Sequence, residues 1–280
     1  LRENYIGMLA NSYNNKVKVV YTNHFILAND AVTRLSNKLL DARQDQMIAV
    51  CNKGREQLMA NGWSGEHIQV IFNAVDPAAW AGERSESTMR AELGIPEDRF
   101  VILCASRFAD DKGHKYLINS VKRLTELTDR PFTLVLAGDG PLLEETRAQA
   151  GELGLTEEQV RFIGFRKDIK NLYKGSDLYV NSSRHEALSF LIIEAMAAGL
   201  PVIATDMGGN SDIVNDAAGC GLLVKYDDPD SMAQAMKVML EEPHFLAQCR
   251  QGAERTIQEK FEINKMAAAT YAVYQKALQG

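Results

Sequence analysis

Short apolar segments alternate with longer amphipathic segments along almost the whole chain of 280 residues. The apolar segments lack the one-in-two alternation of a half-exposed strand, so we expect strands that are buried on both faces. A helical pattern between successive strands indicates a parallel sheet with right-handed crossovers. The sequence therefore predicts an α/β fold built from doubly wound parallel sheets.

The expected elements form two sets, separated by a polar stretch at 73–86. The first set has strands at 17–21, 46–50 and 68–72 and helices at 27–43 and 52–61. The second has strands at 100–105, 132–137, 159–163, 177–181, 201–204 and 221–225, with helices between them and over most of 229–279. We expect 1–76 to be the remainder of an N-terminal Rossmann-like domain and 77–261 to be a second domain. Because the chain opens on Leu1 within a helical pattern near 5–9, we expect the first domain to be truncated at its start.

The composition is that of a globular protein, with 46% apolar and 24% charged residues and a net charge of −6. The acidic balance argues against nucleic acid as a partner. The four cysteines are widely spaced, which fits a reducing, cytoplasmic setting better than a disulfide scaffold. The apolar stretch 187–204 contains Glu194 and is broken at Gly199, so we expect no transmembrane helix. Residues 1–60 are mildly basic. We interpret these charges as scattered and solvated, and peripheral contact with an anionic membrane surface is the alternative.

Two cations flank one strand-to-helix loop of the second set. Arg107 follows the strand at 100–105, and Lys112 comes where the next helix starts. Such a loop directs two cations and free helix N–H groups at one anion, and a diphosphate would suit it. Alone, the pair is a weak signal, because solvated loop charges explain it more simply. The run Gly138-Asp139-Gly140-Pro141 is no dinucleotide fingerprint, because Leu143 occupies the third glycine position; we expect a tight turn with Pro141 at the first helical position.

Two carboxylates lie eight positions apart, across the entry to the helix at 190–199. Glu186 falls in the loop after the strand at 177–181, and Glu194 lies about one turn inside the helix. A carboxylate at the second position can accept hydrogen bonds from a ribose diol, while the helix N-terminus holds phosphate. An unpaired Glu194 in these apolar surroundings would be costly, so we expect either a ligand or an ion pair with a neighbouring Arg or Lys.

These motifs follow one another in a fixed order from about Val17 to the end of the chain. They are Arg107 with Lys112-Gly113, Gly138-Asp139-Gly140-Pro141, the segment 160–164, Glu186-x7-Glu194, the segment 197–205 and Gly208-Gly209. In this order and spacing the set resembles the retaining GT-B glycosyltransferases of glycosyltransferase family 4, the glycosyl transferases group 1. The resemblance implies a GT-B fold of two Rossmann-like domains: 1–76 on the acceptor side and 77–261 binding the nucleotide-sugar donor. It also implies that a final helix at 262–280 crosses back to the first domain.

The resemblance also assigns roles to individual residues. It implies that Arg107 and Lys112 bind the donor diphosphate and stabilise it as it leaves. It implies that Glu194 holds the ribose, that Glu186 faces the donor sugar, and that His24 reaches the sugar from the other domain. Further donor contacts are implied for Gly138, Phe165 and the backbone of Ser189, Phe190 and Leu191. The family commonly has Gly-Phe-Gly after the first glutamate, whereas Ala187-Leu188-Ser189 stands here, which leaves the donor sugar open.

No nucleophile with an adjacent base is evident, so we expect attack by an acceptor hydroxyl on the same face as the leaving phosphate. We expect no metal or other cofactor, and Asp228-Pro229-Asp230 looks like a helix cap. The expected donor is a UDP- or GDP-linked sugar and the acceptor a carbohydrate or lipid-linked hydroxyl, as in polysaccharide or glycolipid biosynthesis. Two alternatives stay open: a nucleotide-sugar epimerase of the same fold, and a non-catalytic nucleotide-sugar-binding subunit.

Overall fold

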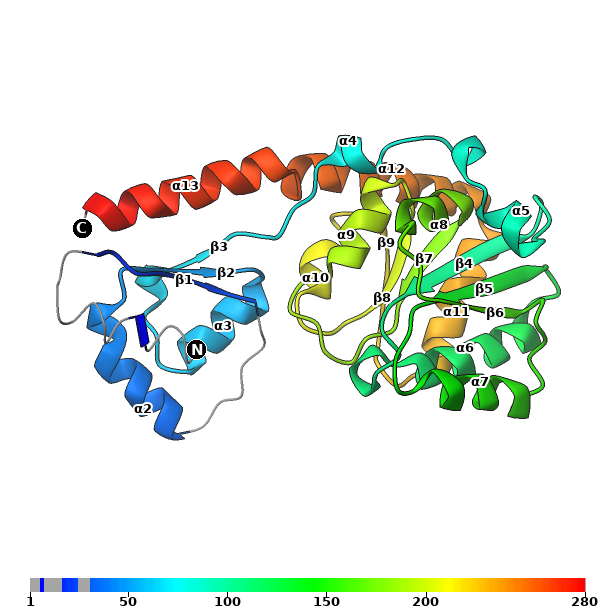
Figure 1. The fold of residues 1–280 in the computed structure, drawn as a ribbon, viewed down its shortest axis with the longest axis horizontal. Coiled ribbons are helices and arrows are strands. Elements are labelled where there is room, and N and C mark those ends of the chain that lie inside the picture. Colours follow the sequence, from blue (N-terminus) through cyan, green and yellow to red (C-terminus); the bar gives the residue numbers. More distant parts are fainter. Residues whose placement is uncertain (1–5, 8–16, 25–30, 280) are drawn as a thin grey trace.

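The computed structural model describes residues 6–7, 17–24 and 31–279, which build two separate parallel sheets (Figure 1). The helix expected near 5–9 lies mostly outside the described residues. Parallel sheets with helical crossovers confirm the predicted α/β class. The two sheets fall on either side of residues 71–99; the exact domain boundary at residue 76 stays a prediction.

The smaller sheet has the strand order β1-β2-β3, with β1 at Val20–Asn23, β2 at Gln46–Ala49 and β3 at Ile68–Val70. Helices α2 (Ala31–Leu40) and α3 (Asn52–Ala60) and 3-10 turns at Asp41–Arg43 and Gly65–His67 connect the strands. Successive side chains of β2 point to opposite faces. Met47 packs on one face with Leu58 and Trp63, and Ile48 packs on the other with Val273.

The larger sheet has the strand order β6-β5-β4-β7-β8-β9, all parallel. The strands are β4 (Phe100–Ala105), β5 (Phe132–Ala137), β6 (Val160–Gly164), β7 (Leu178–Asn181), β8 (Val202–Thr205) and β9 (Gly221–Val224). From β4 the chain winds outward one way to β6, then returns to β7 and winds the other way. The order therefore reverses between β4 and β7, and ligands of such sheets bind beyond the carboxyl ends of the strands at this point.

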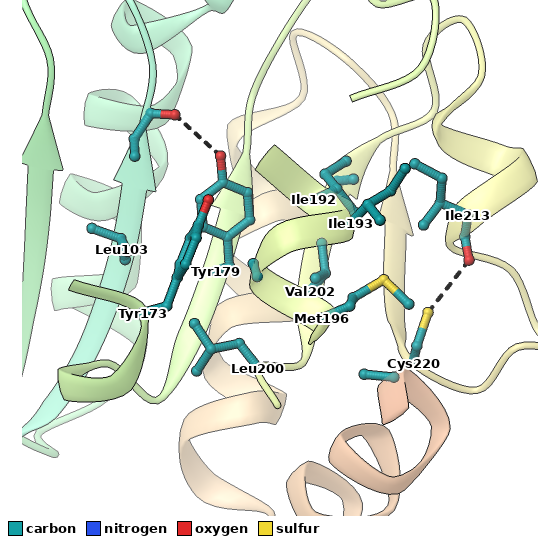
Figure 2. Packing of buried hydrophobic residues seen from close by; sticks show 14 of the residues in the cluster. Leu103, Tyr173, Tyr179, Ile192, Ile193, Met196, Leu200, Val202, Ile213 and Cys220 are labelled. Atoms are coloured by element: carbon teal, nitrogen blue, oxygen red, sulfur yellow. Dashed lines mark hydrogen bonds between the residues drawn. The ribbon is translucent and has the colours of Figure 1, made fainter. Parts of the chain in front are cut away.

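Helices cover both faces of this sheet because its strands are apolar on both faces. Along β4, Val101 and Leu103 pack on one side and Ile102 and Cys104 on the other. Figure 2 shows the first of these cores, where Tyr179 donates its hydroxyl proton to the Ala105 carbonyl oxygen. The covering helices are α6 (His114–Leu127), α7 (Leu143–Glu152), α8 (Ile169–Gly175), α9 (Phe190–Ala197), α10 (Asn210–Ile213), α11 (Pro229–Glu241) and α12 (Pro243–Lys260).

Two polypeptide segments connect the two sheets, and they lie side by side. The outgoing segment leads from β3 through α4 (Pro77–Trp80), a 3-10 turn at Arg84–Glu86 and α5 (Met89–Leu93). The returning segment joins α12 to α13 (Ile263–Gln279), and a parallel bridge pairs Val75 with Glu262 where the two segments meet. Helix α13 then lies along the smaller sheet (Figure 1), where its Val273 is fully buried.

The structure corrects the sequence analysis at the turn after β5. Pro141 was expected at the first helical position, but α7 begins at Leu143. Gly140 has a φ of 152°, and the Leu142 N–H donates to the Phe108 carbonyl oxygen, so the chain is still turning against the neighbouring loop. The short helices α4, α5 and α10 were not expected either, because four or five residues carry too little periodicity to be recognised.

A buried ion pair fastens the outgoing segment to the larger sheet. Arg90, only 3% exposed, donates hydrogen bonds to the Asp177 carboxylate at 2.7 Å and to the carbonyl oxygens of Gly175, Pro96 and Arg99. Asp177 also accepts from the Val101 backbone N–H at 2.8 Å. The guanidinium therefore satisfies several carbonyl groups that would otherwise be buried without a partner.

We expect Arg90→Ala to lower the free energy of unfolding by about 3–5 kcal/mol, because the carbonyl oxygens of Gly175, Pro96 and Arg99 lose their donor at a cost of about 1–3 kcal/mol for each buried group left unsatisfied, whereas Asp177 keeps its ion pair with Arg84 at 2.6 Å. Arg123→Ala is the matched control: it removes an exposed pair with Asp230 and should cost no more than about 1 kcal/mol. Urea unfolding followed by circular dichroism measures both values. Equal losses in the two variants would contradict the role given to Arg90.

Candidate active site

The candidate site lies where the order of the larger sheet reverses. A cavity of about 650 Å³ opens there. Loops that follow β4, β5 and β6 form its wall, together with the start of α9. Its lining residues are Ala105, Ser106, Arg107, Ala137, Gly138, Asp139, Gly140, Phe165, Arg166, Ile169 and Leu191.

Arg107 projects from the loop after β4 and is exposed. It forms no ion pair with any residue that the structure describes, although Asp110 and Asp111 follow closely in the same loop. The loop continues through a 3-10 turn at Asp110–Lys112 to Gly113, the residue before α6. Gly113 has a φ of 67°, and a Cβ there would lie 2.1 Å from the Ser182 carbonyl oxygen. Only glycine allows the loops after β4 and β7 to approach this closely.

Lys112 and Glu186 meet across these two loops. The Lys112 Nζ donates to the Glu186 Oε1 at 2.8 Å, and the Ser183 hydroxyl donates to the same oxygen at 2.8 Å. Burial opposes the charge on Lys112, but the hydrogen bond and charge of Glu186, with the charge of Asp111, outweigh it and raise the pKa of Lys112. The lysine therefore stays charged, and the Glu186 carboxylate balances its charge.

Glu194 is half-buried and has no such partner. The Tyr173 hydroxyl donates to its Oε2 at 3.4 Å, and no Lys or Arg of the described chain forms an ion pair with it. Burial raises the pKa of Glu194, while the hydrogen bond from Tyr173 opposes the rise. The ion pair that was one alternative for Glu194 is therefore not formed with any described residue, whereas Glu186 has one. Glu194 keeps acceptor capacity for a ligand.

The turn after β5 brings backbone close to the cavity. Gly138 has a φ of 149°, and a Cβ there would lie 1.9 Å from the Ser106 carbonyl oxygen. Gly140 fits equally tightly against the backbone of Phe108. Phe165 follows β6 and lines the cavity, with 69% of its surface exposed.

The start of α9 faces the same region. Ser189 precedes the helix and makes no side-chain capping bond; its hydroxyl instead accepts a hydrogen bond from the Asn181 amide at 3.4 Å. The first N–H groups of a helix have no partner within it, so this terminus is suited to an anion. Phe190 is 47% exposed, and Leu191 lines the cavity. Leu188, one of the departures from the family pattern, is buried in the core.

His24 comes from the other part of the molecule. It directly follows β1, whose carboxyl end points towards the larger part (Figure 1), and it is exposed. No hydrogen bond or ion pair joins its side chain to another described residue, and its role stays a prediction. The structure therefore brings the loop residues of the larger sheet together, and it shows no side-chain interaction between them and His24.

Sequence reasoning missed the groups that orient the two glutamates. Tyr173 on α8 lies 21 positions before Glu194, and Ser183 lies two residues after the buried strand β7. No local pattern distinguishes either residue from an ordinary buried tyrosine or loop serine. Asp228 caps α11 through the Ser231 N–H, as predicted. Among the described residues, no group of His, Cys, Asp and Glu side chains is arranged to hold a metal ion.

Comparison with known proteins agrees with this geometry. The family model of glycosyl transferases group 1 matches residues 85–256, which is more than half of the chain. The chain belongs to this family. Within the described part of the chain, no helix is long and apolar enough to cross a membrane.

Family members with assigned activities are similar over most of the chain. A 2-deoxystreptamine glucosyltransferase of Streptomyces kanamyceticus is 32% identical over 75% of this chain and 55% of its own length. The lipopolysaccharide core biosynthesis mannosyltransferase LpsB of Rhizobium meliloti is 28% identical over 87% of this chain and 69% of its own length. This chain thus spans little more than half to about two thirds of these relatives.

Solved structures confirm the GT-B fold. The crystal structure of HepE from Anabaena in complex with UDP has a TM-score of 0.88 and 25% identity, covering 96% of this chain and 75% of that one. The same protein in complex with UDP and glucose gives a TM-score of 0.84. A sucrose-phosphate synthase from Thermosynechococcus elongatus, at 21% identity and a TM-score of 0.79, shares the fold.

We expect Glu186→Gln to lower the pKa of Lys112, because burial then acts on the ammonium with less compensation. Reductive ¹³C-methylation and NMR titration of the lysines would measure the change. Glu66→Gln, an exposed glutamate of the smaller part, is the control and should leave the Lys112 resonance unchanged. An unchanged pKa in Glu186→Gln would contradict the contact.

Proposed function

We propose that this chain is the donor-binding part, with the adjoining cleft, of a retaining and metal-independent glycosyltransferase of family 4. One observation carries the proposal: the exposed Arg107 and the ion-paired Lys112 lie on loops beside a cavity at the reversal point of the sheet. Cations at this place are suited to a nucleotide diphosphate.

The donor would extend across the site from base to sugar. The nucleobase would occupy the cavity near Phe165 and Gly138, and the ribose diol would donate to the Glu194 carboxylate. The diphosphate would lie between Arg107, Lys112 and the N-terminus of α9. A uridine nucleotide is favoured because the similar Anabaena protein was crystallised with UDP; a GDP-linked donor is the alternative.

The donor sugar would lie next to Glu186. When the diphosphate approaches Lys112, its oxygens would replace the Glu186 carboxylate as acceptors and release that carboxylate for sugar hydroxyl groups. The lysine is thus kept charged until the donor arrives, and the glutamate avoids being buried without a partner. His24, which follows β1, would approach the sugar from the opposite side of the cleft.

The reaction would need charge stabilisation more than a base. The bond between the anomeric carbon and the phosphate oxygen breaks as the acceptor oxygen bonds to that carbon on the same face. The acceptor proton passes to the departing phosphate oxygen, and Arg107 and Lys112 stabilise the remaining negative charge. The acceptor would be a carbohydrate or lipid-linked hydroxyl, in line with the lipopolysaccharide role in the name of the Rhizobium relative.

Calorimetric titration with UDP, GDP and ADP tests the donor site. We expect one nucleotide to bind and Glu194→Ala to weaken its binding by roughly 10- to 100-fold, as for the loss of hydrogen bonds to a charged group. Glu152→Ala, an exposed glutamate at the end of α7, should have no effect. Because burial raises the pKa of Glu194, lowering the pH should weaken binding before an ordinary glutamate would become protonated, and Glu194→Gln should flatten this dependence. If no nucleotide binds, the proposal fails.

Transfer assays on the protein test the chemistry. We expect Lys112→Ala to lower kcat by about 10²–10³-fold, the usual effect of removing one donor to developing charge. NMR of the product should show the donor's anomeric configuration, and activity should survive EDTA. Lys115→Ala, an exposed lysine at the start of α6, is the matched control. An inverted product or inactivation by EDTA would contradict the mechanism.

A further inference from the structure

Besides the two connecting segments, direct hydrogen bonds join the two parts of the molecule. The Asp212 carboxylate of α10 accepts two hydrogen bonds from Asn52, the first residue of α3 in the smaller part. The backbone N–H donates to Oδ2 at 2.7 Å, and the side-chain amide donates to Oδ1 at 2.7 Å. A carboxylate at a helix N-terminus also interacts favourably with the helix dipole.

Apolar packing lies directly beside these hydrogen bonds. Gly209 fits between the two parts: a Cβ there would lie 2.7 Å from the Cys51 Cβ and 2.1 Å from the Ala187 carbonyl oxygen. Cys51 is fully buried and shares one continuous core with Leu188 and Ile213 of the larger part. The two parts are thus closely packed here, and Ala187, which contacts Gly209, directly follows Glu186.

Hydrogen bonds lead from this interface to the site. Asn210, the first residue of α10, donates to the Thr205 carbonyl oxygen and to the Asn181 Oδ1. The same Asn181 oxygen accepts from the Ser183 N–H at 3.2 Å. The Ser183 hydroxyl in turn donates to Glu186. The helix that carries Asp212 is therefore connected to the group that holds Lys112.

We propose that Asp212 is an interdomain latch: by binding both N–H groups of Asn52, it holds the two parts closed and positions the loop of Glu186. The Val75–Glu262 bridge, where the two connecting segments pair, then serves as the hinge. Loss of the latch opens the interface between Cys51 and Gly209 without disturbing the nucleotide cavity, whose lining residues do not include Asp212.

Thiol reactivity gives a direct test in the unlabelled protein. Cys51 lies in the interface, whereas the buried Cys104, Cys220 and Cys249 belong to the larger part and serve as internal controls. We expect Asp212→Ala to increase the rate of Cys51 alkylation about tenfold, since charge-assisted hydrogen bonds are lost. Mass spectrometry resolves the four thiols. Asp216→Ala, an exposed aspartate four residues later, is the matched control and should not change any rate.

A second variant acts from the other side of the latch. Asn52→Pro removes both donors, yet proline is well tolerated at a first helical position, and Cys51 already has the extended conformation that precedes proline. It should also raise Cys51 alkylation about tenfold, with hydrogen exchange of the remaining α3 amides unchanged. If Cys51 stays unreactive in both variants, or if all four thiols become reactive together, the latch is refuted.

A third readout rests on the proposed function. In Asp212→Ala, UDP affinity by calorimetry should stay within about twofold of wild type, while kcat/KM for transfer falls about tenfold. An unchanged kcat/KM beside a faster Cys51 reaction would overturn the positioning role. If wild-type protein binds no nucleotide, the proposed function fails, while the alkylation result still decides whether Asp212 holds the parts closed.

Discussion

The close backbone approach between the loops after β4 and β7 is the constraint on which the site depends. Gly113 lies against the Ser182 carbonyl oxygen with no room for a side chain, and the Ser182 hydroxyl donates to the Lys112 carbonyl oxygen at 2.9 Å. The Arg184 N–H donates to the Asp111 carbonyl oxygen at 2.7 Å. These contacts fix two loops that are 70 positions apart in the chain, so that Lys112 and Glu186 meet in a defined geometry.

Much of the fold could be predicted because the local sequence patterns favour the same helices and strands that the folded chain contains. The strands Phe100–Ala105 and Phe132–Ala137 were placed to the residue, since each is a short, almost wholly apolar run, the first between Arg99 and Ser106 and the second between Pro131 and Gly138. Arg107, Lys112, Gly138 and Glu186 were proposed as site residues from their positions after strands, whereas Phe165 and residues 189–191 came from the family resemblance. The pairing of Lys112 with Glu186 was not predicted. It depends on β4 lying next to β7, and local periodicity does not reveal the order of strands in a sheet.

The contacts that sequence reasoning could not supply are those that packing alone creates. Tyr173 reaches Glu194 because α8 and α9 share one core, and Asp212 reaches Asn52 because two sheets meet. A buried tyrosine and an aspartate in a one-turn helix have many structural explanations, and only their spatial neighbours distinguish between these. The sequence indicates which groups can do the chemistry, while the packing decides which of them act on one another.

The return of α13 to the smaller sheet also sets an order of events during folding. The face of β2 that carries Ile48 is covered by Val273, which leaves the ribosome more than two hundred residues later. The larger sheet, in contrast, draws all of its strands from one continuous stretch of chain. During synthesis, one apolar face of the smaller sheet therefore stays uncovered until α13 has been made, after the larger part. Helix α13 completes a domain whose described strands are made much earlier, and a chain cut short before α13 would leave that domain prone to aggregation.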